Sequence, residues 1–235
     1  MNLPEFELTP YYTIKLPMLG REISYRPYTV GEEIGLLTHV EAEDKPNIIE
    51  ALTSLLKNCV KQKDIFEDLS LIDFTYILVH VRAKSKGEII ELEKHCSKCE
   101  ALEPMNFDVI KSLKIENQKN VKNVIELTDT VKLEIGILPA TFLSDSIKID
   151  NEGELKLFTL ASTIRKVIIN DKIYNNLSVE EVMVKVIKKA TTTQLKFFVE
   201  KVNELASMKS SVDCVCEKCG HKDVVEFDNV LSFLS

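Results

Sequence analysis

The chain has 235 residues, of which 45% are hydrophobic and 29% are charged. This composition excludes a disordered or fibrous protein and suits one large domain or two smaller ones. The 37 acidic and 30 basic residues give a net charge of −7, which repels a phosphate backbone, so we expect no nucleic-acid partner. No apolar run reaches the roughly 18 residues that span a bilayer, and the first residues lack the features of a signal peptide. We therefore expect no membrane partner and a protein made in a cytoplasm.

The beginning of the chain predicts a β-hairpin followed by a helix. Apolar and polar residues alternate over 12–16 and again over 23–25, on either side of a turn at 17–20, which is the period of paired strands. Thr29 and Glu32, three residues apart, form a capping box, and apolar residues recur behind it at helical spacing.

Two further helices are predicted before the first cysteine pair. One begins near Pro46 and carries an apolar stripe that includes Cys59, which we assign to the core. The next is capped at Ser70 and ends near Gly87. The stretch 88–94 is typical of a strand and leads directly into the first cysteine pair.

The second half of the chain repeats the pattern of the first. Residues 52–73 resemble residues 160–181 at a constant offset of 108, and the predicted helix caps coincide. Residues 96–113 resemble residues 216–233 at an offset of 120. The alternative is chance similarity between two helix-rich segments. The shared order, caps and cysteine spacing favour a duplicated unit.

We therefore predict an α+β fold made of two copies of one hairpin-plus-helices unit. The first repeat is residues 1–118 and the second is residues 119–235, and each copy ends in a β-knuckle. The cysteines of the two knuckles are Cys96, Cys99, Cys216 and Cys219.

Five of the six cysteines lie in two tight clusters, which in a reducing compartment indicates a metal. Two thiols separated by two residues at a tight turn form a zinc knuckle, which supplies half of the tetrahedral ligand set that zinc prefers. The two knuckles together predict one closed, structural zinc site in a zinc-ribbon-like arrangement. The long chain between them is acceptable because the cost of loop closure grows only logarithmically with length.

Other residues near the knuckles leave alternatives open. Cys214 lies two residues before Cys216 and is either a replacement ligand or a spare thiol. His95 and His221 adjoin the knuckles, and we expect them to be exposed turn residues. The remaining alternative is that the cysteines pack or oxidise, although a redox pair needs a nucleophilic thiol at a helix start.

Catalytic motifs are missing from the sequence. It contains no glycine-rich phosphate loop, no His-Glu-x-x-His and no Gly-x-Ser-x-Gly. His39 and His80 fall within helical patterns, where a satisfied or solvent-facing histidine is the expected reading. We expect no enzyme activity and no small-molecule substrate.

Three apolar residues are candidates for partner binding. A helix over 193–206 is expected to bury a stripe and to leave Phe197 pointing away from it. Phe233 and Leu234, near residue 235, are also apolar and are candidates for the same role. The alternative is that Phe197 packs on another part of the protein. The predicted buried stripe of this helix consists of Leu195, Phe198, Val199, Val202 and Leu205.

The stretch LPMLGREISYRPYTVGEE, the segment LSLIDFTYILVHVRAKSKGEIIEL and the knuckle after it resemble the baseplate hub assembly protein family of T-even-like contractile-tailed bacteriophages. The likeness spans most of the chain and is strongest from Lys15 to Cys99. It implies a non-enzymatic morphogenesis protein that acts in the host cytoplasm and contacts baseplate hub proteins. The family supplies no catalytic residues.

Three functions follow as hypotheses. The first is an assembly factor or chaperone for the hub, and the second is a permanent structural subunit of the baseplate in the virion. The third is a zinc-ribbon nucleic-acid-binding accessory factor, which needs a basic face near the knuckles. The lysines there are offset by neighbouring acids, which disfavours this third function.

Overall fold

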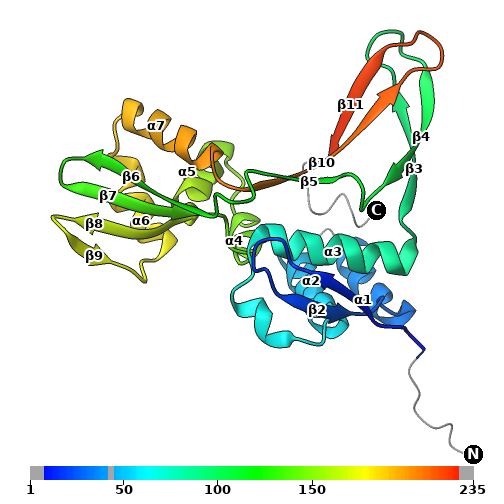
Figure 1. Ribbon diagram of the computed structural model, residues 1–235, viewed down its shortest axis with the longest axis horizontal. Coiled ribbons are helices and arrows are strands. Elements are labelled where there is room, and N and C mark those ends of the chain that lie inside the picture. The colour runs from blue at the N-terminus through cyan, green and yellow to red at the C-terminus, as the bar shows by residue number, and fades with distance from the viewer. Residues whose placement is uncertain (1–7, 42–44, 228–235) are drawn as a thin grey trace, which may run out of the picture.

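The computed structural model describes residues 8–41 and 45–227. Figure 1 shows two lobes that contain the helices and a narrow β arm that projects away from them. The N-terminal lobe and the second lobe are each continuous in sequence, whereas the arm is built from strands of both halves of the chain. No helix in these ranges is both long and apolar enough to cross a membrane.

The N-terminal lobe is a hairpin packed against three helices. Thr29 N donates to a Glu32 carboxylate oxygen at 2.8 Å and Glu32 N donates to Thr29 Oγ1 at 3.4 Å, so the predicted capping box is confirmed. Cys59 is fully buried, as predicted. The elements are β1 (Tyr12–Lys15), β2 (Glu22–Tyr25), α1 (Val30–Glu41), α2 (Lys45–Cys59), the 3₁₀ turn η1 (Lys63–Glu67) and α3 (Leu71–Lys86).

The second lobe is a four-stranded antiparallel sheet in the order β6-β7-β8-β9 with helices packed against it. Its core joins Leu133 and Ile135 of β7 to Phe158 of α5 and Phe198 of α7. The elements are β6 (Lys122–Thr128), β7 (Val131–Gly136), α4 (Phe142–Ser146), α5 (Glu152–Thr163), β8 (Ile164–Ile169), β9 (Lys172–Tyr174), α6 (Val179–Lys185), η2 (Ile187–Lys189) and α7 (Thr192–Asn203).

One prediction about α7 is wrong. Val199 was expected in the buried stripe, but its exposed fraction is 37%, whereas Phe198 is 2% exposed. The observed stripe passes through Leu195, Phe198 and Val202, at spacings of three and four residues. Val199 lies about 100° around the helix from Phe198, at the edge of this narrow stripe.

The arm consists of two β-hairpins that lie side by side (Figure 1). β3 pairs with β4, and β10 pairs with β11 on one edge and with β5 on the other. Where the arm meets the N-terminal lobe, Phe107 and Val109 are buried against Val79 and Ala83 of α3. The strands are β3 (Ile89–His95), β4 (Leu102–Asp108), β5 (Leu113–Glu116), β10 (Ser207–Val215) and β11 (Lys222–Phe227).

The two halves of the chain agree in part. Ser70 and Ser178 both cap helices by accepting an amide hydrogen bond from the residue three positions later, at 3.0 and 3.1 Å. Between them the halves differ, because 164–174 forms the β8-β9 hairpin where the first half has the end of α2 and η1. The duplication therefore stays a prediction, whereas the mixed content of helices and strands is confirmed.

Candidate metal centre

Each cysteine pair occupies a tight turn between two strands, as predicted. In the first turn, Cys96 N donates to Ala101 O and Glu100 N donates to Cys96 O, both at 2.9 Å. In the second, Cys216 N donates to His221 O at 2.9 Å and Gly220 N donates to Cys216 O at 2.8 Å. The turn residues Glu100 and Gly220 both adopt positive φ, 56° and 67°. The two knuckles therefore have the same backbone.

The strands beside the two turns also pair in the same register. In the first hairpin, Ile90 lies opposite Phe107 and Lys94 opposite Glu103. In the second, Ser210 lies opposite Phe227 and Cys214 opposite Asp223. Each of these four pairs has its counterpart at an offset of 120 residues, so the two turns present their thiols in equivalent positions.

The four sulfurs of the knuckles converge at the tip of the arm. Cys96 Sγ lies 3.7 Å from Cys219 Sγ, and Cys99 Sγ lies 3.6 Å from Cys216 Sγ. All four sulfurs lie within 4.8 Å of one another. A tetrahedral site with Zn–S bonds of about 2.3 Å has sulfur–sulfur edges of about 3.8 Å. The cluster is therefore compatible with a metal ion, and no pair is a disulfide.

Local hydrogen bonds favour the thiolate form of one of the four cysteines. The amides of Lys98 and Cys99 donate to the Cys96 sulfur and lower the pKa of this thiol to about 6. The Lys98 N to Cys96 Sγ distance is 3.5 Å. Because the thiolate is the form that binds metals, the turn favours the reactive form of Cys96 near neutral pH.

Cys216 has the opposite electrostatic environment. Burial raises the pKa of its thiol to about 12, with a further contribution from the hydrogen bond with Glu103. The Cys216 Sγ donates to Glu103 Oε1 over 3.1 Å. Metal binding would displace this proton, because a thiol must be deprotonated to become a ligand.

Cys214 lies outside this group of four sulfurs. Its sulfur donates to Asp223 O at 3.4 Å and lies 3.7 Å from Lys94 Nζ. Lys94 also forms an ion pair with Asp223 across the two hairpins, with Nζ 2.6 Å from the carboxylate. The structure thus places Cys214 on the inner face of the arm, as a neighbour of the cluster. His95, whose Nδ1 lies 3.2 Å from Glu100 O, is exposed, as predicted, whereas His221 is half-buried.

Sequence reasoning missed the polar contacts between the hairpins. Glu103 and Asp223 both follow the second cysteine of their knuckle by four residues. This shared position was the available signal, and the structure turns both carboxylates toward the opposite hairpin. These two contacts help to hold the hairpins together below the cysteine cluster.

The predicted partner-binding residues lie elsewhere. Phe197 is 38% exposed on α7, in the second lobe and far from the tip of the arm (Figure 1). Lys201 Nζ lies 5.8 Å from the centroid of the Phe197 ring. Phe233 and Leu234 lie outside the described residues, so their role stays a prediction.

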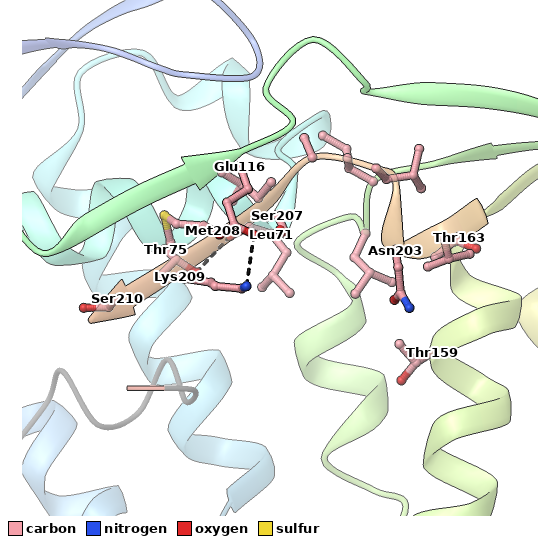
Figure 2. A pocket seen from close by; sticks show the side chains of 16 residues that line it. Leu71, Thr75, Glu116, Thr159, Thr163, Asn203, Ser207, Met208, Lys209 and Ser210 are labelled. Atoms are coloured by element: carbon pink, nitrogen blue, oxygen red, sulfur yellow. Dashed lines mark hydrogen bonds and ion pairs between the residues drawn. The ribbon is translucent and has the colours of Figure 1, made fainter. Parts of the chain in front are cut away.

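A pocket lies between the two lobes. Figure 2 shows a pocket of about 530 Å³ lined by Leu71 and Thr75 of α3, Thr159 and Thr163 of α5, and the start of β10. Its one pair of opposite charges is Lys209 and Glu116, 3.0 Å apart. The lining side chains are otherwise apolar or uncharged.

The fold and the cluster define a mixed α/β protein with one four-cysteine site compatible with a metal ion. The model of the family described as T4 bacteriophage base plate protein matches residues 9–235, nearly the whole chain. The chain therefore belongs to this family of phage baseplate proteins. No curated protein and no solved structure matches it.

Proposed function

We propose that the protein is an assembly factor for the phage baseplate hub that works through protein–protein contacts and catalyses no reaction. The family match over residues 9–235 supports a role in the phage baseplate. It acts in the host cytoplasm while the hub is built. A permanent structural subunit of the baseplate is the alternative, and family membership supports both functions equally.

The metal is proposed to be zinc in a structural role. Four thiolates complete a tetrahedral shell, so no position remains for water or substrate. The ion would join two hairpins whose cysteines are separated by 117 and 123 residues of chain. Zinc would thereby fix the direction of the arm relative to the lobes and keep its surface ready for contact.

The arrangement of the two hairpins also supports the proposed duplication. Residues 1–118 and 119–235 would be two copies of one unit, and the matched register of the hairpins and the matched caps favour this. A nucleic-acid role receives no such support, because Lys94 beside the cluster is already paired with Asp223. Exposed lysines could attract phosphates, but the net charge of −7 repels a phosphate backbone.

The experiment that separates the two baseplate functions is a comparison of assembly intermediates with mature particles. Tagged protein from infected cells is captured, its hub partners are identified, and purified phage are assayed for the chain. Presence in intermediates and absence from phage is the expected result. Stoichiometric recovery in mature phage would instead establish the structural subunit.

Phe197→Asp tests the proposed partner contact on α7 in the same capture. We expect weaker recovery of hub proteins, because a charge replaces an exposed aromatic anchor. Val184→Asp on α6 is the matched control, since Val184 is also exposed but was not predicted to bind. Equal recovery with both variants would remove Phe197 from the interface.

A further inference from the structure

Helix α1 of the N-terminal lobe has an exposed apolar face. Val30 and Ile34 are 72% and 60% exposed, and Leu37 and Val40 are 37% and 36% exposed. Among the described residues of this helix, Leu36 alone joins the buried core of the lobe. Figure 1 shows α1 on the side of this lobe that faces away from the second lobe. Apolar residues gathered on one exposed face are typical of a protein–protein interface.

Two glycines lie beside these apolar residues. Gly31 and Gly35 are four residues apart, about one helical turn. Neither has a positive φ. Apart from the nearby backbone of the helix, a Cβ atom added at either glycine would meet no atom of the described residues within 4 Å. Because glycine lowers the stability of a helix relative to alanine, packing within one chain gives no reason for glycine at these positions.

The exposed residues of α1 form a ridge beside a groove. Residues four apart line up in rows along an α-helix. Val30, Ile34 and Thr38 form one row, and Gly31 and Gly35 lie in the next row, about 100° around the helix. Side chains project from the first row, whereas the second row is bare backbone. The ridge of one such helix therefore fits the groove of another, where the glycines allow the two backbones to approach closely.

The charges on α1 are compatible with a contact between two copies of the same face. Glu32 Oε1 lies 2.7 Å from Arg26 Nη2, and Glu33 Oε1 lies 3.0 Å from Lys86 Nζ. Both acids of the first turn are thus neutralised within the lobe. An apolar face without free charge matches a partner face that is also apolar and uncharged. A second copy of α1 supplies a face of this kind.

We propose that two copies of the chain dimerise through α1, with the two helices crossing at Gly31 and Gly35. A two-fold interface uses the same patch on both subunits, so each ridge enters the groove of the other copy. Val30 and Ile34 of each copy are then covered by the other. Packing of four-residue rows gives a crossing angle of about −50°. The dimer does not depend on the proposed role in hub assembly.

Sedimentation equilibrium of the full chain with zinc present tests the dimer. At micromolar concentrations, the wild type should have twice the mass of one chain. Gly35→Leu should raise the dimer dissociation constant at least about tenfold, because the leucine fills the groove. The variant should still fold, since its Cβ has open space in one chain. An added leucine would strengthen a non-specific apolar association, so equal or tighter association of Gly35→Leu would overturn the proposal, as would a monomeric wild type.

A charge on the ridge provides a second test. Ile34→Asp should also weaken the dimer at least about tenfold, because the interface would bury an unpaired carboxylate. Val184→Asp on α6 is the matched control, since Val184 is 53% exposed, and it should remain a dimer. A monomeric wild type whose recovery of hub proteins falls with Ile34→Asp would show that a hub protein covers α1, and the dimer would then be rejected.

Cross-linking tests where the two copies meet. Gly35 lies beside the proposed two-fold axis and therefore beside Gly35 of the second copy. Cα atoms about 4.4 to 6.8 Å apart allow a disulfide. Gly35→Cys should join two chains through this residue, identified by peptide mass under non-reducing conditions, whereas Val184→Cys should not. A dimer of Gly35→Cys that lacks this link would place the interface elsewhere and contradict the proposal.

Discussion

Glu103 and Cys216 come from opposite hairpins of the arm, and Glu103 Oε1 lies 3.1 Å from Cys216 Sγ. The equivalent acid, Asp223, is paired with Lys94 at 2.6 Å. The position that corresponds to Lys94 in the second knuckle is Cys214, so no lysine stands there to pair with Glu103. The Asp223 carboxylate is therefore neutralised by Lys94 of the opposite hairpin, whereas the Glu103 carboxylate faces the cysteine cluster without a lysine partner at that position.

Glu103→Gln should therefore strengthen binding of the proposed zinc ion. Four thiolates and one Zn²⁺ carry a net negative charge, which the Glu103 carboxylate opposes. We expect the zinc dissociation constant to fall several-fold, measured by competition with a chromophoric chelator. Glu91→Gln is the control, because Glu91 is exposed on β3. Weaker zinc binding in Glu103→Gln would show that the carboxylate supports the site.

Loss of a proposed zinc ligand should lower the stability of the fold far more than loss of the neighbouring Cys214 thiol. Structural zinc sites contribute on the order of 10 kcal/mol to folding, so Cys96→Ser should lower the thermal midpoint by about 10 °C or more. Cys214→Ser should leave it nearly unchanged, because its sulfur lies outside the group of four. Both are measured by thermal unfolding with zinc present. Equal midpoints for wild type and Cys96→Ser would remove the zinc proposal.

Asp73 joins the first hairpin to α3 and should be important for stability. Its carboxylate accepts the amides of Met18 and Leu19 at 2.9 and 3.0 Å, and its exposed fraction is 1%. Asp73→Ala leaves these amides without their acceptor, at a cost of about 2 to 4 kcal/mol in the free energy of unfolding. Asp64→Ala removes an exposed ion pair with Arg21 and should change little. Denaturant titration measures both, and equal effects would contradict this role.

His80 should make the N-terminal lobe sensitive to acid. The expectation that it is satisfied or solvent-facing is wrong, because the ring is buried beside Tyr76 and, among the described residues, its Nε2 has no hydrogen-bond partner. Burial lowers the pKa of His80 from 6.5 to about 4. The unfolded chain therefore binds the proton more readily, and stability falls as the pH drops from about 6.5 toward 4.

Between pH 7 and pH 5 this effect should remove about 2 kcal/mol from the free energy of unfolding. Urea titration at the two pH values measures it. His80→Phe keeps a ring in the core but has no group to titrate, so the difference between pH 7 and pH 5 should shrink in this variant. An unchanged difference would assign the acid sensitivity to other groups.

Much of the local structure follows from residues that are close in sequence. The capping box of Thr29 and Glu32, the cap at Ser70 and the tight turn at each cysteine pair were predicted and are present. Each depends on hydrogen bonds that span only a few residues. The spacing of apolar residues likewise predicts a hairpin or a helix, because the apolar residues lie on the face that is buried.

Tertiary structure decided how these local parts come together. The convergence of sulfurs 117 and 123 residues apart depends on how the lobes place the two hairpins, although the matched spacing suggested it. Residues 164–174 form β8 and β9, whereas the corresponding residues of the first half form the end of α2 and η1. β8 pairs with β7, and this pairing could not be predicted from residues close in sequence. The contacts of Glu103 and Asp223 also needed the two hairpins side by side. The sequence by itself therefore determined the individual helices, hairpins, caps and turns. Packing between distant segments determined which of these elements contact one another.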